Sequence, residues 1–399
     1  MYFQSIDDKQ ECVGVYCNGN LQFHEYSLDE FSKTWKYSKP LKEYETIEYA
    51  QLYAQSEEIF EACPESLKQD NIETLNNIKA LIKSLKIAKV DLKENCIFDL
   101  IPHNNLKTYL ELKNTITKHV FNTHEKPLNY DHLLKITKMI EDIKSQEIKI
   151  NYKALKKDSF APKARNFLKN KNKFDNFIRY RMFSTKTGRL SSQKRSFPIL
   201  TLDKDLRKYI EPSNDVYLEL DFNAAEIRTF LALNDQSQPD IDIHDWNIKN
   251  IFNGSITRPE AKKRIFAWLY NPNSKDHMID KFYNRDALRG KFWDGEKVST
   301  PFHREILSDE FHSVYYILQS TSNDIFLEQA YKVFKMLQGW QSKVAFLMHD
   351  SITIDFARQD FNKIYEIATL FENTRFGKFK TNVQVGNNFG QMKDFTWKR

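Results

Sequence analysis

The spacing of hydrophobic positions changes along the chain, and the change predicts two kinds of structure. Residues 45–90 and 105–148 carry helical periodicity, because their apolar residues return to one face every three or four positions. From about residue 185 onward, strand-like runs alternate with helical runs. We therefore expect a boundary near 120–150, with a catalytic unit of mixed helix and sheet after it.

A strand that leads directly into a helix is predicted at 216–233. In Val216-Tyr-Leu-Glu-Leu-Asp221 the apolar residues alternate with other types, and Ala224–Leu233 has a helical composition. An Asp at this junction can leave the sheet edge and meet a metal ion. Capping the helix is the more ordinary role for such a residue.

A hairpin with an acidic tip is predicted at 343–356. Two β-rich runs, Lys343–Met348 and Ile352–Phe356, flank the polar turn His349-Asp350-Ser351. A His-Asp pair alone carries little information. Two strands that each deliver one carboxylate, Asp221 and Asp350, can hold two divalent ions about 4 Å apart, as in-line phosphoryl displacement requires.

One stripe of a further predicted helix carries two cations and then two aromatic residues at intervals of four: Arg258, Lys262, Phe266 and Tyr270. Thr257 and Glu260 have the spacing of a capping box, and the helix is expected to stop at Asn271. Cations near the positive helix N-terminus suit a triphosphate, and the aromatic rings suit a base. The alternative is an ordinary amphipathic helix, whose apolar face would not carry Arg and Lys in register.

Basic and aromatic residues interleave between Tyr152 and Tyr180, where Lys169, Lys171 and Lys173 lie. The whole chain has a net charge of +6 and a pI of about 8.8, which is compatible with a nucleic-acid partner. The interleaving suits a surface that tracks phosphates. The alternative is a plain solvated face.

Composition excludes several other classes. No apolar run of about eighteen residues suggests a membrane span, and no secretory signal is evident. Cys12 and Cys17 lack a second metal-spaced pair, so we interpret the four cysteines as reduced cytosolic thiols and not as a zinc site. Tyr2-Phe3-Gln4-Ser5 resembles the remnant of a protease-cleavable tag and is expected to lie outside the natural protein.

The order of these elements resembles that of the family A (DNA polymerase I-like) DNA polymerases, in a minimal, phage-type form. The motifs that carry the resemblance are Thr187-Gly188-Arg189-Leu190-Ser191-Ser192, Asp221-x4-Glu226, Asp242-Ile243-His244, Arg258-x3-Lys262-x3-Phe266-x3-Tyr270, Gln319-Ser-Thr-Ser-Asn-Asp324, His349-Asp350 and Val385-Gly386-Asn387-Asn388-Phe389. Their number and order make chance agreement remote.

The resemblance implies a role for each matching residue. Asp221 and Asp350 match the catalytic carboxylates that bind two Mg²⁺ ions, which Mn²⁺ can replace, and Phe222 is expected at the same metal site. Glu226 matches the steric gate against a sugar 2′-hydroxyl. The incoming nucleotide is expected to meet His244, Arg258, Lys262, Phe266 and Tyr270. Primer-template DNA is expected to meet Arg189, Gln319, His349, Lys169, Lys171 and Lys173.

The sequence departs from the pattern of this family at several positions. Ser351 stands where these polymerases usually carry Glu, and the His-Asp-Ser form also occurs in single-subunit RNA polymerases. Phe311 and Tyr315 stand where polar contacts with the duplex are expected. Asn271 replaces a usual Gly. These positions put the corresponding contacts in doubt.

The resemblance also implies an α+β right-hand polymerase, with an antiparallel palm sheet, helical fingers and a short helical thumb, after a small α/β N-terminal region. The expected divisions are 6–120 as a degenerate exonuclease-like region, 121–182 as connecting helix and thumb, 183–236 and 306–399 as palm, and 237–305 as fingers.

The predicted activity is DNA-directed DNA synthesis, in which deoxynucleotides are added to a primer 3′ end and pyrophosphate is released. Proofreading is not expected, because residues 6–120 contain no Asp-x-Glu pair. The expected partners are primer-template DNA, dNTPs and a processivity factor or other replication proteins, in the cytoplasm of the cell or of a phage host. The alternatives are a single-subunit RNA polymerase-like enzyme, which Ser351 favours, and an inactive polymerase-like DNA-binding protein.

Overall fold

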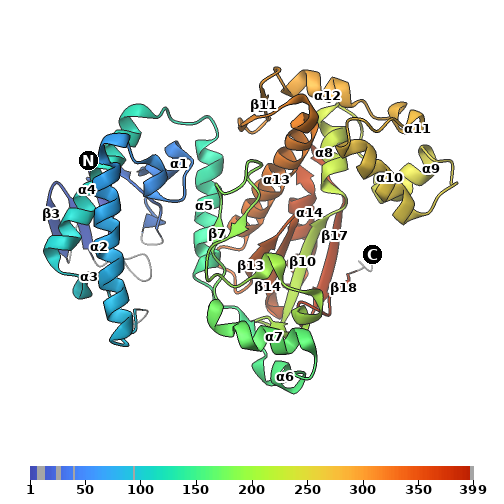
Figure 1. Cartoon of the computed structure of the whole chain (residues 1–399). Helices are drawn as coiled ribbons and strands as arrows, with labels where there is room; N and C mark the ends of the chain where they lie inside the picture. The colour runs from blue at the N-terminus through green and yellow to red at the C-terminus, as the bar shows by residue number, and fades with distance from the viewer. Residues whose placement is uncertain (7–13, 24–27, 39–40, 93–94, 396–399) are drawn as a thin grey trace. The chain divides into compact units, whose positions relative to one another are not determined.

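A small mixed sheet lies at the centre of the first of two units, Met1–Asp142, of the computed structural model (Figure 1). The structure describes residues 1–6, 14–23, 28–38, 41–92 and 95–395. The strands are β1 (Tyr2–Ser5), β2 (Gly14–Cys17), β3 (Asn20–Phe23), β4 (Lys33–Thr34) and β5 (Glu48–Tyr49), in the order β3-β2-β1-β4-β5. Strands β1 to β3 are antiparallel, whereas β4 and β5 run parallel to β1.

The alternation of apolar and polar residues over 11–30, around Asn18-Gly19-Asn20, predicts a short hairpin. In the described part of this segment the hairpin is confirmed as β2 and β3. Asn18 and Gly19 connect the strands with φ values of 48° and 80°, the left-handed backbone that an Asn-Gly turn favours. Cys17 is buried, and its thiol donates to the carbonyl of Tyr2 at 3.0 Å. Cys12, considered with Cys17 as a zinc pair, lies outside the described residues.

Tyr2–Ser5, interpreted from the sequence as resembling a tag remnant, lie inside the sheet of this unit. These residues form β1, the central strand of the sheet, and Phe3 is fully buried. The side-chain amide of Gln4 donates to Asn114 at 3.2 Å and to Thr117 at 3.1 Å. A segment with a buried aromatic ring and paired backbone on both sides belongs to the core of this unit.

The helical periodicity of the first half corresponds to three long helices: α2 (Lys68–Ile87), α4 (His103–Thr123) and α5 (Tyr130–Lys144). Helix α5 crosses the division between the units. Shorter turns complete the unit: α1 (Ala50–Ala54), η2 (Ile59–Ala62), η3 (Glu65–Leu67) and α3 (Ile97–Leu100). None of the described helices combines the length and the apolar character needed to cross a bilayer.

The second unit, Ile143–Arg399, is built on an antiparallel sheet in the order β13-β14-β10-β17-β18. The strands are β10 (Val216–Phe222), β13 (Lys343–Met348), β14 (Ser351–Phe356), β17 (Thr381–Gly386) and β18 (Lys393–Asp394). Three helices accompany the sheet: α8 (Ala225–Leu233), α13 (Glu310–Met336) and α14 (Ile364–Glu372). Helix α14 packs against β10 and β17, and α13 packs against both α14 and α8. The Phe222 ring, for example, stacks on Phe371 of α14 at 4.4 Å.

The predicted mixture of helix and sheet, the strand-to-helix junction and the late hairpin are all confirmed. The turn of the hairpin is shorter than predicted. Ser351 is already the first residue of β14 and pairs with Met348, so only His349 and Asp350 connect the strands. His349 has a φ of 57°. Tertiary pairing of Ser351 with Asp221 of β10 extends the strand.

A group of short helices and one hairpin lies at one end of this unit (Figure 1). They are α9 (Ile243–Asn250), α10 (Arg258–Tyr270), α11 (His277–Asp280), α12 (Arg285–Phe292), β11 (Lys297–Ser299) and β12 (Glu305–Leu307). Their core includes Trp268, which is 1 % exposed and donates to Asp280 at 2.7 Å.

Two basic helices, α6 (Tyr152–Lys157) and α7 (Pro162–Asn170), lie at the other end of the unit, followed by η4 (Lys171–Lys173) (Figure 1). The remaining elements connect these parts: β6 (Lys149–Ile150), β7 (Tyr180–Arg181), β8 (Ser191–Ser192), η5 (Ile199–Thr201), η6 (Lys204–Tyr209), β9 (Ile210–Glu211), η7 (Arg358–Lys363), β15 (Asn373–Thr374) and β16 (Gly377–Lys378).

Candidate functional site

Two carboxylates meet at one end of the antiparallel sheet. Asp221 lies near the end of β10 and pairs with Ser351 of β14. Asp350 directly precedes Ser351 in the two-residue turn. The register of β10 with β14, together with the turn that precedes β14, therefore brings Asp221 and Asp350 together, although they are far apart in the sequence.

Asp221 lies in a buried and acidic environment. Burial and the charges of Asp350 and Glu219 raise the pKa of Asp221 from 3.8 to about 7. Asn382 of β17 is a weak partner, with its amide nitrogen 3.5 Å from the carboxylate, and the charge of Lys262 also favours the ionised form. Burial and the two neighbouring carboxylates therefore outweigh Asn382 and Lys262 in setting the pKa of Asp221.

Glu219 is a member of this acidic group that the sequence analysis did not single out. It precedes Asp221 by two residues on β10, so both side chains point to the same face of the sheet. Burial raises the pKa of Glu219, and Ser351 and Arg207 partly offset that effect. The period-two pattern of the strand was the signal that could have identified it.

The donors of this site fit a hard divalent cation. Asp221 and Asp350 supply carboxylate oxygens, and the backbone of the next residue, Phe222, continues along the same strand end. Oxygen donors of this kind are what Mg²⁺ and Mn²⁺ prefer. The described residues contain no group of three or more His, Cys, Asp or Glu side chains arranged to hold a metal. The fit therefore rests on the two like-charged carboxylates and the neighbouring Glu219.

We expect Asp221→Asn to stabilise the metal-free protein at pH 8. Because the folded-state pKa of Asp221 is about 7 and its ordinary value is 3.8, wild-type stability should fall as the pH rises from about 4 to about 7. The variant cannot lose that proton, and it should be more stable by about 1–2 kcal/mol at pH 8 after solvent screening. Chemical denaturation in EDTA across this pH range measures the effect. If the free energy of unfolding depends on pH identically in the two proteins, Asp221 is not destabilised by burial and by its neighbouring carboxylates.

Helix α10 displays the predicted stripe. Its capping box is formed, since Glu260 accepts from the backbone N–H of Thr257 at 2.8 Å. The Lys262 ammonium lies 5.9 Å from the centre of the Phe266 ring. The rings of Phe266 and Tyr270 are nearly parallel, with centres 5.9 Å apart. The helix thus presents cations at its N-terminal end and stacked rings towards its C-terminal end.

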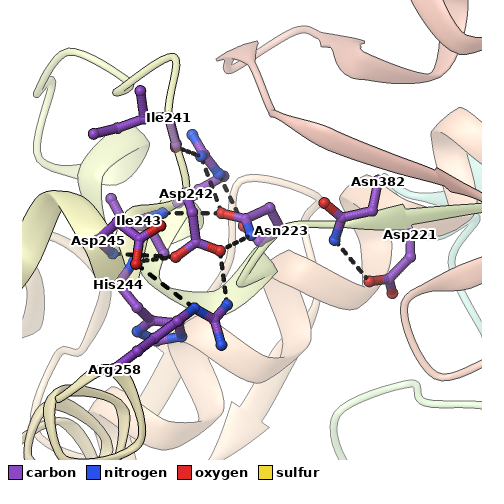
Figure 2. A network of polar contacts seen from close by, with 10 residues as sticks. Asp221, Asn223, Ile241, Asp242, Ile243, His244, Asp245, Arg258 and Asn382 are labelled. Carbon is purple, nitrogen blue, oxygen red and sulfur yellow. Dashed lines mark hydrogen bonds and ion pairs between the residues drawn. The ribbon is translucent and has the colours of Figure 1, made fainter. Parts of the chain in front are cut away.

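Arg258 is held by a polar network at the start of α10 (Figure 2). Its guanidinium donates to Asp242 at 2.7 Å and lies 3.8 Å from Asp245. Asp242 also caps α9 by accepting from His244 N–H at 2.8 Å, and it accepts from Asn223 at 2.7 Å. Asn223 follows Phe222 at the end of β10. The network therefore links Arg258 to the strand that carries Asp221 (Figure 2).

His244 is buried beneath this network, with only 3 % of its surface exposed. Burial lowers its pKa to about 4, so the ring is neutral at physiological pH. Its Nδ1 atom has no hydrogen-bond partner among the described residues, and its ring centre lies 6.1 Å from that of Phe266. A neutral imidazole beside the stripe can donate or accept a hydrogen bond, but it contributes no charge.

Glu226 lies in the first turn of α8, between two other predicted site residues. Its carboxylate accepts from the Arg189 guanidinium at 2.9 Å. Burial and the charge of Glu226 together raise the pKa of the Tyr270 hydroxyl well above its ordinary value. The acidic side chain is therefore held beside the aromatic end of α10.

The turn that presents Arg189 rests on a buried ion pair. Gly188 has a φ of +74°, and a Cβ atom there would collide with the guanidinium of Arg304. Arg304 bonds to Asp324 of α13 at 2.9 Å, and Asn323 donates to the Gly188 carbonyl at 3.1 Å. Both the left-handed backbone and the lack of space require glycine at this position.

The residues predicted to contact DNA are scattered over several elements. Gln319 is buried on α13, and its side-chain oxygen already accepts from the Tyr315 hydroxyl at 2.6 Å. His349 is exposed at the hairpin turn. Lys169, Lys171 and Lys173 are exposed on α7 and η4, and in the described part of the chain none of the three forms an ion pair.

Comparisons with known proteins do not identify a family. No protein-family model matches the sequence, and no curated protein matches it. Among solved structures, the chain is similar to the structure described as the POL domain of Pol1 from M. smegmatis in complex with DNA primer-template and dNTP. The two share 11 % identity with a TM-score of 0.42, and the match covers 72 % of this chain. The chain spans about half, 54 %, of the length of that structure.

Proposed function

We propose that this chain is a DNA-directed DNA polymerase of the family A type. The observation that carries the proposal is the pairing of Asp221 and Asp350 at the end of the sheet, where Lys262 of α10 is close enough to lower the pKa of Asp221. A nucleotide bound along α10 would place its phosphates near this pair and its base near the stacked rings.

In this proposal the sheet and α8 form the palm (183–236 and 306–399), the α9–α12 group forms the fingers (237–305), and α6 and α7 belong to a short thumb (121–182). Asp221, Asp350 and the backbone of Phe222 would hold two Mg²⁺ ions, with Mn²⁺ as a substitute. When bound, the ions supply charge stabilisation for the phosphoryl group and activation of the primer hydroxyl.

The triphosphate would be bound by side chains at the N-terminal end of α10 and beside it. Arg258 would exchange its bond to Asp242 for the phosphates, since an exposed ion pair contributes little stability. Lys262 would add a second cation on the same side of the helix. The buried, neutral His244 would donate a hydrogen bond to a phosphate oxygen. Fixed cations of this kind do most of the protein's work in phosphoryl transfer.

The sugar and base would be selected at the other end of α10. Phe266 would pack on the nucleotide and Tyr270 would lie at the templating position. Glu226, held by Arg189 at 2.9 Å, would occupy the space of a 2′-hydroxyl. We also propose that residues 6–120 are a degenerate exonuclease-like region without proofreading activity.

Primer extension with dNTPs and rNTPs offered separately tests this function. Wild-type protein with Mg²⁺ should extend a DNA primer on a DNA template with dNTPs, release pyrophosphate and leave a mismatched primer unshortened. De novo RNA synthesis with rNTPs would favour the RNA polymerase alternative, which Ser351 supports. If the protein binds the duplex but synthesises nothing with either Mg²⁺ or Mn²⁺, the inactive DNA-binding alternative would be favoured.

The exposed lysines of the proposed thumb predict a salt-sensitive complex. Replacing Lys169, Lys171 and Lys173 with Gln should flatten the log–log dependence of primer-template affinity on salt by about two to three units, because each contact releases about one counterion. The chemical step should be nearly unchanged, and products made under a DNA trap should be shorter. Affinity measured between about 50 and 200 mM salt checks this.

A matched control for that experiment is Lys163→Gln. Lys163 lies on the same helix but is already paired with Asp203 at 2.9 Å and Asp205 at 2.7 Å, so its removal should leave the slope close to wild type. An unaltered slope in the triple variant would show that the cluster is only a solvated face.

A further inference from the structure

A continuous row of aromatic rings leads away from the proposed nucleotide site. Tyr270 at the end of α10 contacts Tyr315 of α13 with ring centres 5.6 Å apart. Tyr315 contacts Tyr316 at 5.4 Å, Tyr316 contacts His312 at 6.1 Å, and His312 contacts Phe311 at 5.1 Å. We call the four rings at the start of α13, namely Phe311, His312, Tyr315 and Tyr316, the aromatic row.

The aromatic row is only partly used by the protein core, since Tyr316 packs against the core on one edge whereas Phe311 and His312 are exposed. The first turns of α13 bury Ser313, Val314, Ile317 and Leu318, while the aromatic row lies on the other side of the helix. Phe311 is 49 % exposed, and Tyr315 and Tyr316 are partly exposed. Large rings gathered on the solvent side of a helix typically mark a binding surface.

The charges around the aromatic row suit a polyanion. The Lys186 ammonium lies 5.7 Å from the centre of the Tyr316 ring, and Lys262 lies over Phe266 at the other end of the chain of rings. The acidic residues nearby are already engaged, since Asp309 bonds to His312 at 2.8 Å and Glu310 bonds to Arg289 at 2.8 Å. Aromatic rings with interspersed cations are the usual platform for single-stranded nucleic acid.

We propose that the aromatic row stacks the unpaired bases of the template strand before they reach Tyr270. This inference rests on the proposed polymerase function. Bases inside a duplex are already stacked on one another, whereas an unpaired base has a free face for a protein ring. Because the row is continuous with Tyr270 and Phe266, the strand that occupies it leads directly to the nucleotide site, and the template is the strand that arrives there unpaired.

The test measures binding without dNTP or metal, so that it is independent of catalysis. Fluorescence anisotropy would compare a primer-template with a 5′ template overhang, the same molecule with abasic overhang nucleotides, and a blunt duplex. Wild type should prefer the normal overhang to the abasic one by about tenfold or more, because abasic nucleotides keep the phosphates and remove the stacking faces. The blunt duplex should bind like the abasic substrate.

Phe311→Ala with Tyr316→Ala should abolish this preference while leaving blunt-duplex affinity within about twofold. The single variant Phe311→Ala, at an exposed position, should reduce the preference without affecting folding, and Phe311→Trp should retain it. The control is Phe361→Ala, because Phe361 is similarly exposed, at 53 %, on η7. 2-Aminopurine in the overhang should be quenched by wild type and not by the double variant.

Two results would overturn the inference: equal wild-type affinity for normal and abasic overhangs, or an unchanged preference in the double variant. In either case, dNTP-dependent extension by the same proteins would leave the polymerase proposal standing. Failure of that proposal has a different signature, namely absence of extension by wild type on every substrate.

Discussion

Asp221→Asn and Asp350→Asn are each expected to reduce primer extension by at least ~100-fold while leaving primer-template affinity within a few-fold of wild type. The proposed site has two carboxylates, one from β10 and one from the β13–β14 turn. Among the described residues no group of three or more acidic, His or Cys side chains could hold the metal in their place, so the loss of either carboxylate should abolish metal binding. Single-turnover extension and anisotropy on the same preparations measure the two quantities.

The controls separate a lost ligand from a damaged fold. Asp221→Asn is expected to raise metal-free stability, so its inactivity cannot be attributed to unfolding. Asp235→Asn, at an exposed carboxylate that pairs with Lys291 at 2.8 Å, should remain fully active. Mn²⁺ should raise the melting temperature of wild type but not of Asp221→Asn. Residual extension above about 1 % in either variant would remove that carboxylate from the proposed metal site.

Glu226→Ala is expected to raise the incorporation of ribonucleotides relative to deoxynucleotides by about 100-fold. Removing the carboxylate opens the space that a 2′-hydroxyl would need beside Tyr270. A steric filter of this kind costs the excluded substrate a few kcal/mol. Single-turnover incorporation of one dNTP and of the matching rNTP gives the ratio.

The structure supplies the control for this variant, because Glu226 also holds Arg189 at 2.9 Å. Glu226→Ala therefore frees a cation as well as opening space. Arg189→Ala frees the carboxylate but leaves it in position, so it should weaken DNA binding without relaxing sugar selection. If both variants relax selection equally, the gate depends on the ion pair and not on the volume of Glu226.

Much of the local structure could be predicted from the sequence, because it depends on neighbouring residues. The alternation in 216–221, the capping signal at Thr257 and the Asn18-Gly19 turn each act within a few positions, and each element formed as predicted. The position of Tyr2–Ser5 as a central strand could not be predicted in this way. The burial of Phe3 depends on strands and a helix distant in sequence, which a short motif cannot reveal.

By itself, the sequence determined the elements and the residue types they carry: a strand ending in Asp221, a hairpin with Asp350, and a helix with cations and rings at intervals of four. Only the tertiary structure decided which of these side chains meet. The antiparallel register of β10 with β14 places the carboxylates together, and the resulting burial raises the pKa of Asp221 to about 7. The partners of Arg258 and Glu226, and the row of rings on α13, likewise depend on segments that only folding brings into contact, since such contacts leave no periodic trace in the chain.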